Sequence, residues 1–193
     1  LIMSMVLLVL AHCAFTMSYE SLLPAISKEK LALGSVGVSY LLGGVGGGAL
    51  LTSIFLAGIR NEATRGKLFL LFGVCSGLAP FALALSSSWE LSIVAAVGIG
   101  ATQAGFMTIS HAIIQSLVDD EVRGRVSGVY SVHVGGSMAV TNLINGTLAD
   151  FFTAPVVMAA GGALFIVAIF VSVGSGTLRG IYFPRIADPV AAA

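Results

Sequence analysis

Charged residues in this chain fall into a few clusters, and the stretches between the clusters are long and uncharged. Each of six such stretches reaches the roughly 18 residues at which an apolar run becomes a candidate transmembrane helix. About 20 residues at about 1.5 Å rise cross the hydrocarbon core of a bilayer. The pattern therefore predicts an all-α membrane protein with six transmembrane helices, over about 1–19, 33–59, 68–86, 91–118, 126–148 and 154–178.

Composition and net charge exclude several other classes of protein. Hydrophobic residues make up 57% and charged residues 9% of the 193 residues, and the mean hydropathy is +1.02, so a soluble domain would lack polar surface. The formal net charge is zero, so the chain lacks the excess positive charge that would attract nucleic acid. The alternating segments of about 10 residues that a β-barrel would need are not visible. A lipid bilayer is the expected surrounding.

The charge clusters alternate between the two sides of the predicted membrane, and this alternation sets the orientation. One side carries only Lys28 and Lys30. The other side carries seven basic residues, Arg60, Arg65, Lys67, Arg123, Arg125, Arg179 and Arg185. Because cytoplasmic loops carry the excess of Lys and Arg, we expect the second side to be cytoplasmic. Residues 1–178 then form one bundle, and residues 179–193 form a cytoplasmic C-terminal tail.

Polar residues are unevenly distributed among the six predicted helices. The helices over 91–118 and 126–148 carry most of them, and polar groups in a span are costly unless they meet protein or water, so we expect both helices to be interior. The least polar helices, 68–86 and 154–178, are expected to face lipid. The six helices divide into two triplets that start from opposite sides of the membrane, which predicts two inverted three-helix repeats.

Glycines are concentrated in the predicted helix over 33–59. They form two overlapping GxxxG pairs, Gly43 with Gly47 and Gly44 with Gly48. Glycine at this spacing lets helix backbones approach closely, and it also leaves a helix easy to bend. Close packing and a flexure used in gating are both open interpretations.

Two loop sequences resemble those of the major facilitator superfamily. The stretch from Gln115 to Ser131, QSLVDDEVRGRVSGVYS, resembles the loop between its tenth and eleventh helices, closest to the bacterial exporters typified by the enterobactin exporter. The stretch from Gly58 to Lys67 occupies the place of its G-x-x-x-D-R-x-G-R-R loop. Gly58, Glu62 and Lys67 match that pattern in place, whereas Ala63, Arg65 and Gly66 do not.

The resemblance covers the whole chain as helices seven to twelve of a twelve-helix fold. It implies a secondary active transporter that exports a small molecule by alternating access from a bacterial inner membrane, with no enzymatic activity and no cofactor. A missing N-terminal six-helix half would be the partner. Leu1 already lies inside an apolar run, so we expect the chain to be a fragment.

The charged loops hold the residues expected at the cytoplasmic gate. Asp119, Asp120 and Glu121 are expected to cap the helix that follows them, and the two arginines after them to pair with these acids, with lipid phosphates or with the missing half. The gating-loop candidates are Gly58, Glu62, Arg65, Lys67, Asp120, Glu121, Arg123 and Arg125.

A polar stripe recurs every four residues along the helix over 126–148, since each such step advances only about 40° around the axis. A polar face on the helix over 91–118 is its expected counterpart, either across a substrate cavity or in plain interhelical hydrogen bonding. The pathway candidates are Glu20, Gln103, Met107, Ser110, His111, Tyr130, His133, Ser137, Thr141 and Asn145. Proton coupling would suit His12, His111 and His133, which change charge near neutral pH, together with the acids Glu20 and Asp150.

Three other functions are compatible with six helices. An intramembrane serine hydrolase would need a His base for Ser137, and no His follows it in the chain. A permease subunit of an ATP-driven importer would need a coupling helix, which the short inner loops do not provide. A self-contained six-helix protein acting as a homodimer is the third.

Overall fold

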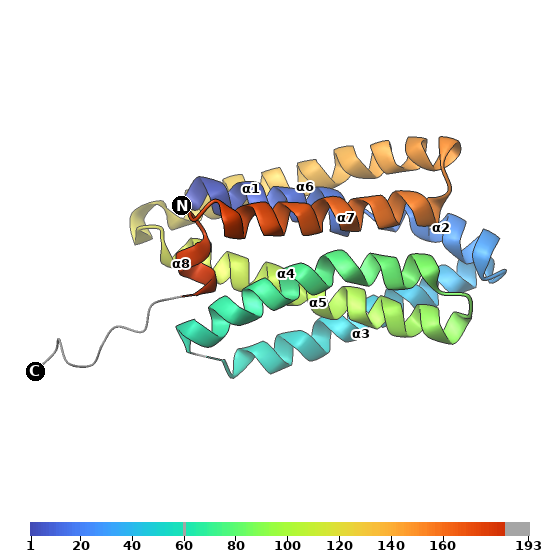
Figure 1. The fold of residues 1–193 in the computed structure, drawn as a ribbon, viewed down its shortest axis with the longest axis horizontal. Helices are drawn as coiled ribbons and strands as arrows, with labels where there is room; N and C mark the ends of the chain where they lie inside the picture. The colour runs from blue at the N-terminus through green and yellow to red at the C-terminus, as the bar shows by residue number, and fades with distance from the viewer. Residues whose placement is uncertain (60, 184–193) are drawn as a thin grey trace, which may run out of the picture.

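The computed structural model describes residues 1–59 and 61–183. Every regular element within these residues is a helix (Figure 1). The long helices are α3 (Gly34–Ala57), α4 (Glu62–Leu85), α5 (Trp89–Ser116), α6 (Asp120–Phe151) and α7 (Ala154–Gly174). The first crossing is a chain of short pieces: α1 (Ile2–His12), the π-helix η1 (Cys13–Met17), the 3₁₀-helix η2 (Glu20–Leu22), α2 (Leu23–Ala25) and the π-helix η3 (Ile26–Lys30). A short α8 (Arg179–Tyr182) follows α7.

Five of the six predicted crossings are long and apolar enough to span a membrane. They are Ile2–Glu29, Gly34–Ala57, Thr64–Leu85, Trp89–Ser116 and Ala154–Gly174. The sixth, α6, has 32 residues and is long enough, but its polar residues keep it outside this group. The prediction of an all-α membrane protein is thus confirmed, while the sixth crossing stays a prediction.

Two helices, α4 and α6, begin six residues earlier than the sequence predicts. α4 starts at Glu62 because Asn61 caps it, with the Asn61 side chain accepting a 3.1 Å hydrogen bond from the Thr64 backbone N–H. α6 starts at Asp120, directly after an extended Asp119. The predicted bounds were wrong because they equated helices with uncharged stretches, whereas first helical turns favour acids and polar caps.

The connections alternate between the two ends of the bundle (Figure 1). The N-terminus, the α3–α4 and α5–α6 connections and α8 lie at one end, and α2 with the α4–α5 and α6–α7 turns lies at the other. The basic residues of the first end are Arg65, Lys67, Arg123, Arg125 and Arg179. Arg60 and Arg185 lie outside the described residues. Lys28 belongs to the opposite end, as the charge alternation predicts.

Close backbone crossings at glycines hold neighbouring helices together. A Cβ at Gly48 of α3 would collide with the Val97 carbonyl of α5, and one at Gly100 of α5 would collide with the Val45 carbonyl of α3. Of the two GxxxG pairs, Gly44 and Gly48 therefore face α5, while Gly43 and Gly47 face open space. Small residues at these positions let the two backbones touch.

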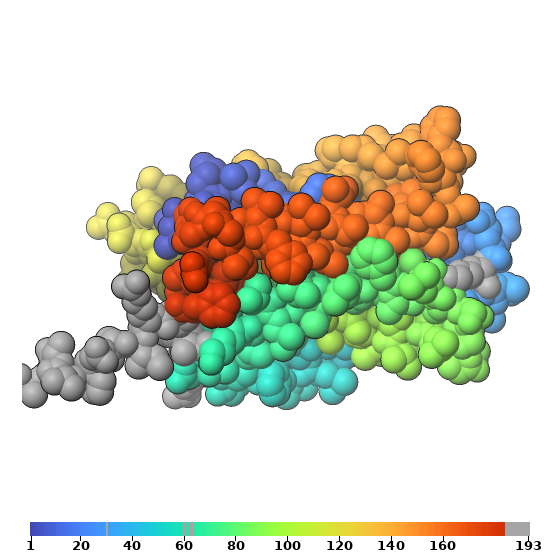
Figure 2. All heavy atoms as spheres, in the orientation of Figure 1, coloured from blue at the N-terminus to red at the C-terminus, as the bar shows by residue number. Residues whose placement is uncertain are grey.

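The α4–α7 crossing is built in the same way. A Cβ on Gly77 would lie 3.0 Å from the Gly162 carbonyl oxygen, and one on Gly162 would collide with the Gly77 carbonyl. The exposed large side chains of α7 are apolar, namely Val156, Leu164, Val167, Phe170 and Val171, as expected of a helix that faces lipid. Figure 2 shows α7 and α4 side by side across one face, with the last turns of α6 beyond α7 at its edge.

α6 is the helix that differs most from its predicted position. It packs on α1, on η1 and η2, and on α7, and Tyr130 is its one buried residue within the described chain. The expectation that α6 is interior is therefore wrong for this chain taken alone, whereas it holds for α5, which buries residues along its whole length.

Candidate functional site at the break in the first helix

The first helix is interrupted after the π-helix η1, and side chains from two other helices bind the freed backbone. Ser18 leaves the helical conformation, with φ −80° and ψ 31°. The Gln103 side-chain amide of α5 donates a 2.7 Å hydrogen bond to the Thr16 carbonyl, and the Asn145 amide of α6 donates a 2.6 Å hydrogen bond to the Ser18 carbonyl. The Ser18 hydroxyl donates to the Cys13 carbonyl at 2.9 Å. The carbonyl groups that a break exposes are thus satisfied by protein, as a membrane interior requires.

Next to the break lies a fully buried histidine. His12 Nε2 is 2.7 Å from Ser76 Oγ of α4, and its ring stacks on Phe106 at 4.3 Å and meets Phe165 edge-on at 4.9 Å. The Thr16 hydroxyl donates to the His12 carbonyl, and the Ser76 hydroxyl donates to Thr16 Oγ1 at 3.4 Å. His12 Nε2 and Ser76 Oγ thus share one buried hydrogen bond between α1 and α4. His12 Nδ1 is buried without a partner among the described residues.

A second histidine joins α5 to α6 near the basic end of the bundle. His111 stacks on Tyr130 with ring centres 5.1 Å apart and planes 7° apart. Gln115 Nε2 lies 3.1 Å from His111 Nε2, and an amide nitrogen only donates, so His111 Nε2 accepts. Ser110, by contrast, donates to the Met107 carbonyl of its own helix, and the Met107 side chain packs in the apolar core.

The middle of the predicted α6 stripe borders open space. His133 is exposed, and its Nδ1 donates to the Val129 carbonyl of the same helix at 2.8 Å. Ser137 and Thr141 are half-buried. Together with Leu10 of α1 they line a hollow of about 440 Å³ between the two helices. Of the stripe, Asn145 and Tyr130 turn inward, while the three residues between them face this hollow.

The predicted meeting of the α5 and α6 polar faces is only partly correct. The two helices approach through His111 and Tyr130. Elsewhere α6 packs on α1, its continuation and α7, whereas α5 packs mainly on α3 and α4. Gln103 and Asn145 therefore meet the backbone of the first helix instead of each other. Glu20 begins η2 and is exposed.

Sequence reasoning missed three residues of this site, Thr16, Ser18 and Ser76. Ser76 was expected on a lipid-facing helix, yet it is fully buried against His12. Its signal was present in the sequence, because a hydroxyl inside an otherwise apolar span is costly unless it has a partner.

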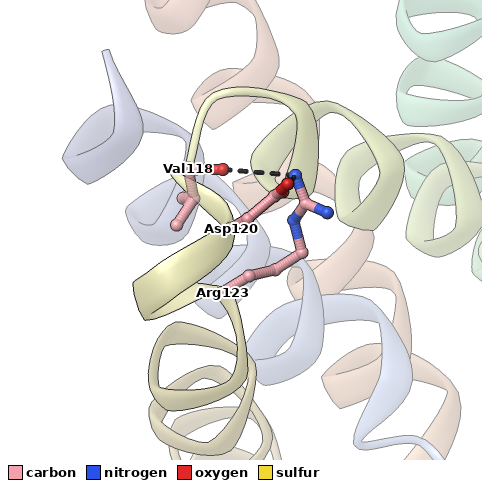
Figure 3. Close-up of polar contacts among 3 residues, drawn as sticks. All are labelled: Val118, Asp120 and Arg123. Carbon is pink, nitrogen blue, oxygen red and sulfur yellow. Dashed lines mark hydrogen bonds and ion pairs between the residues drawn. The ribbon is translucent and has the colours of Figure 1, made fainter.

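The first turn of α6 holds the ion pair that Figure 3 shows. Arg123 Nη2 lies 2.5 Å from Asp120 Oδ1 and 3.5 Å from the Val118 carbonyl. The two side chains are 46% and 85% exposed, so the pair contributes at most a few tenths of a kcal/mol. Asp119 occupies the N-cap position but its side chain makes no capping hydrogen bond, so that part of the prediction is wrong. Glu121 and Arg125 are exposed.

The loop between α3 and α4 supplies the other gating candidates. Gly58 ends α3, and Arg65 Nε donates to the Ile59 carbonyl at 3.1 Å, which folds the arginine back over the loop. Lys67 is exposed, and the Glu62 side chain lies outside what the structure describes. A hollow of about 420 Å³ separates Arg65 from the α5 terminus and α8.

α8 is fixed by one buried tyrosine at this end of the bundle. Ser172 donates its proton to the Ile169 carbonyl at 2.7 Å, so the Tyr182 hydroxyl must donate to Ser172 Oγ, also at 2.7 Å. Burial raises the pKa of the Tyr182 phenol, and the hydrogen bond to Ser172 opposes part of that rise. Tyr182 therefore stays protonated and anchors α8 to α7.

Comparison with known proteins identifies the family to which the chain belongs. A family model described as transmembrane secretion effector, of the major facilitator type, matches residues 2–178. Neither the curated proteins nor the solved structures that were compared contain a match. The matched residues include all the long helices, the broken first helix and both charged loops, and transport is the function of this family rather than an enzymatic reaction. The chain is an integral membrane protein and belongs to the transmembrane secretion effector family of transporters.

Proposed function

We propose that this chain is the C-terminal six-helix half of a secondary active exporter, in which α6 makes the sixth crossing. The observation that carries the proposal is the combination of polarity and exposure in α6. The helix runs alongside α1 and α7 from one end of the bundle to the other (Figure 1), yet His133 and Gly135 are exposed on its surface, and a Cβ added to Gly135 would meet no other atom.

A polar helix in this position needs protein or water beside it. Polar groups inside a membrane face the bundle interior or a water-filled cavity. Within the described chain α6 buries only Tyr130, so this half does not supply that surrounding. A second six-helix half packed across α1 and α6 would supply it, with the two halves related as in other transporters built from repeats.

Alternating access then follows from rocking of the two halves around a site near the middle of the membrane. The substrate is a small molecule, and His133, Ser137 and Thr141 are its polar contacts from this half. His133 is also the residue we propose for proton coupling, because its ring reaches the hollow whereas His12 is enclosed by Phe106 and Phe165. The basic end faces the cytoplasm of a bacterial inner membrane, and the C-terminal tail follows it.

The hydrolase alternative finds no support in the arrangement of serine and histidine. Ser137 has no hydrogen bond to a histidine within the part of the chain described here. Ser76 does contact a histidine, but Ser76 and His12 are both fully buried, so neither is open to a substrate. A homodimer of six-helix chains would also cover α6, and the experiment below distinguishes it.

The test is export by the complete protein in a bacterial host that lacks its own efflux pumps. His133→Ala should reduce export of a fluorescent substrate at least tenfold. Ser131→Ala is the matched control, because Ser131 is equally exposed on α6 but lies about 160° around the helix, where its hydroxyl bonds to the Ser127 carbonyl. Equal export by both variants would contradict the proposed pathway. Export by this chain expressed alone would favour the homodimer.

A further inference from the structure

The hollow at the basic end of the bundle is lined by one charged side chain among otherwise small and apolar ones. It lies between the start of α4, the end of α5 and the short α8, and its volume is about 420 Å³. Apart from Arg65 and Ser116, its lining consists of glycine and aliphatic residues, among them Ile113, Leu117 and Ile181. No acid of the described residues lines it, so the hollow attracts negative charge.

The wall that α8 provides is fixed to two other helices. A Cβ at Gly66 would collide with the Ile181 carbonyl, so the backbone of α8 lies directly on α4. Tyr182 is hydrogen-bonded to Ser172 of α7 at 2.7 Å and stacks on Phe69 of α4 with ring centres 5.5 Å apart. These contacts hold α8 in place, so the hollow is already formed when it is empty.

The guanidinium group of Arg65 is held in position but has no acidic partner. Its Nε donates to the Ile59 carbonyl at 3.1 Å, whereas Nη1 and Nη2 have no hydrogen bond or ion pair to the described residues. Arg123, at the same end of the bundle, is by contrast paired with Asp120. Arg65 is half-buried, and two parallel N–H groups of a guanidinium match two oxygens of a phosphate group. Phosphate is therefore the anion that fits best.

The place and the lining of the hollow favour a phospholipid over a free phosphate ion. α5 ends and α4 begins there, which is the level at which membrane-spanning helices meet lipid headgroups. Ile113 and Leu117 add apolar surface beside Arg65, which the glycerol backbone and first methylenes of a lipid can cover. Basic pockets between helices at the cytoplasmic side bind anionic headgroups in other membrane proteins.

We propose that this hollow binds the phosphodiester headgroup of an anionic phospholipid such as phosphatidylglycerol. Arg65 donates to two phosphate oxygens through Nη1 and Nη2, and the upper part of the lipid lies against Ile113 and Leu117. The lipid stays in the leaflet at the basic end and is not carried across the membrane. This inference goes beyond the proposed function and does not depend on it, because the proposed export pathway lies along α6.

The test measures binding of phosphatidylglycerol to the complete transporter in mild detergent by native mass spectrometry. Arg65→Gln should weaken one lipid site about tenfold, because it removes a pair of charge-assisted hydrogen bonds. Arg123→Gln is the matched control, since Arg123 lies at the same end but already pairs with Asp120, and it should leave every site unchanged. Equal lipid affinities of wild type and Arg65→Gln would overturn the proposal.

A second variant blocks the hollow and keeps Arg65. Ser116→Phe adds a ring to the lining and should weaken the same lipid site about tenfold. Ser131→Phe is its control, because Ser131 is also exposed, also bonds to a carbonyl of its own helix, and lies on α6 outside the hollow. Wild-type affinity in Ser116→Phe would contradict binding in the hollow.

Competition with glycerol 3-phosphate distinguishes the lipid from a soluble phosphate. We expect no displacement of phosphatidylglycerol even by a large excess, since the soluble compound has no hydrocarbon to cover Ile113 and Leu117. Displacement that is lost in Arg65→Gln would assign the hollow to a soluble phosphate and overturn the lipid as its ligand.

Discussion

Gln103 and Asn145 donate their side-chain amides to carbonyls only two residues apart in the first helix, those of Thr16 and Ser18. The two amides come from α5 and α6, which scarcely contact each other in this region. The break in the first helix therefore joins two helices that are separate at this level of the bundle and meet directly only through His111 and Tyr130 near the basic end. A π-helical turn frees carbonyl groups that a regular helix would use internally, and π-helical turns often lie at functional sites.

Loss of the Gln103 amide should destabilise the bundle. Gln103→Leu keeps the approximate size of the side chain but leaves the Thr16 carbonyl buried without a donor, at a cost of about 1–2 kcal/mol. The measurement is reversible unfolding of the complete protein in mixed micelles. Gln115→Leu serves as control, because Gln115 is half-buried and bonds only within its own helix. Equal stability of the two variants would show that the amide does not hold the break.

His12 and Ser76 should show energetic coupling in a double-mutant cycle. His12→Phe keeps the stacking on Phe106 and removes the hydrogen bond to Ser76. Ser76→Ala removes the same hydrogen bond from the α4 side. We expect a coupling of about 1 kcal/mol, the size found for hydrogen bonds between membrane helices. The same cycle with His133→Phe in place of His12→Phe should be additive, since His133 shares no contact with Ser76. Additivity in both cycles would remove His12 from the cluster.

The orientation of the bundle can be tested by labelling single cysteines. In a background of Cys13→Ala and Cys75→Ala, Ser87→Cys in the α4–α5 turn should react with an impermeant thiol reagent applied to intact cells. Leu117→Cys lies exposed in the α5–α6 loop at the basic end, so it should react only after permeabilisation. The reverse pattern would place the basic end outside and overturn the orientation.

The buried Tyr182 should make stability sensitive to alkaline pH. Its folded pKa is raised by burial, so the folded protein holds the phenol proton more tightly than the unfolded chain, whose tyrosines titrate near about 10. The stabilisation is present in full below that pH and is lost as the pH rises through the folded pKa. Thermal unfolding from pH 8 upwards, in about half-unit steps, should therefore fall more steeply for wild type than for Tyr182→Phe. Parallel curves would mean that Tyr182 titrates normally.

The helices and their alternation could be predicted because they depend on local properties of the chain. Charged residues cannot lie in the bilayer core, so their clusters mark the ends of helices and the two ends of the bundle. The starts of α4 and α6 were harder to predict from the sequence. Asn61 caps α4 and the first turn of α6 is acidic, so polar residues that look like loop belong to the helix ends.

The site could be predicted only in its composition. Gln103 and Asn145 were correctly identified as polar residues that need partners, but their partners are backbone atoms exposed by a π-helical turn that no periodicity indicates. Likewise His12 and Ser76 lie 64 residues apart, and their contact depends on how α1 and α4 pack. The position of α6 was missed because its many polar side chains predict a buried helix, whereas Tyr130 is its one buried residue within the described chain.

The reciprocal contact of α3 and α5 has a consequence for substitution. Gly48 lies against the Val97 carbonyl and Gly100 against the Val45 carbonyl, so a methyl group at either position would push the two helices apart. Gln103 lies less than one turn beyond Gly100 on the same helix, and its amide donates to the Thr16 carbonyl. A side chain added at Gly100 would therefore disturb the break in the first helix as well as the contact between α3 and α5.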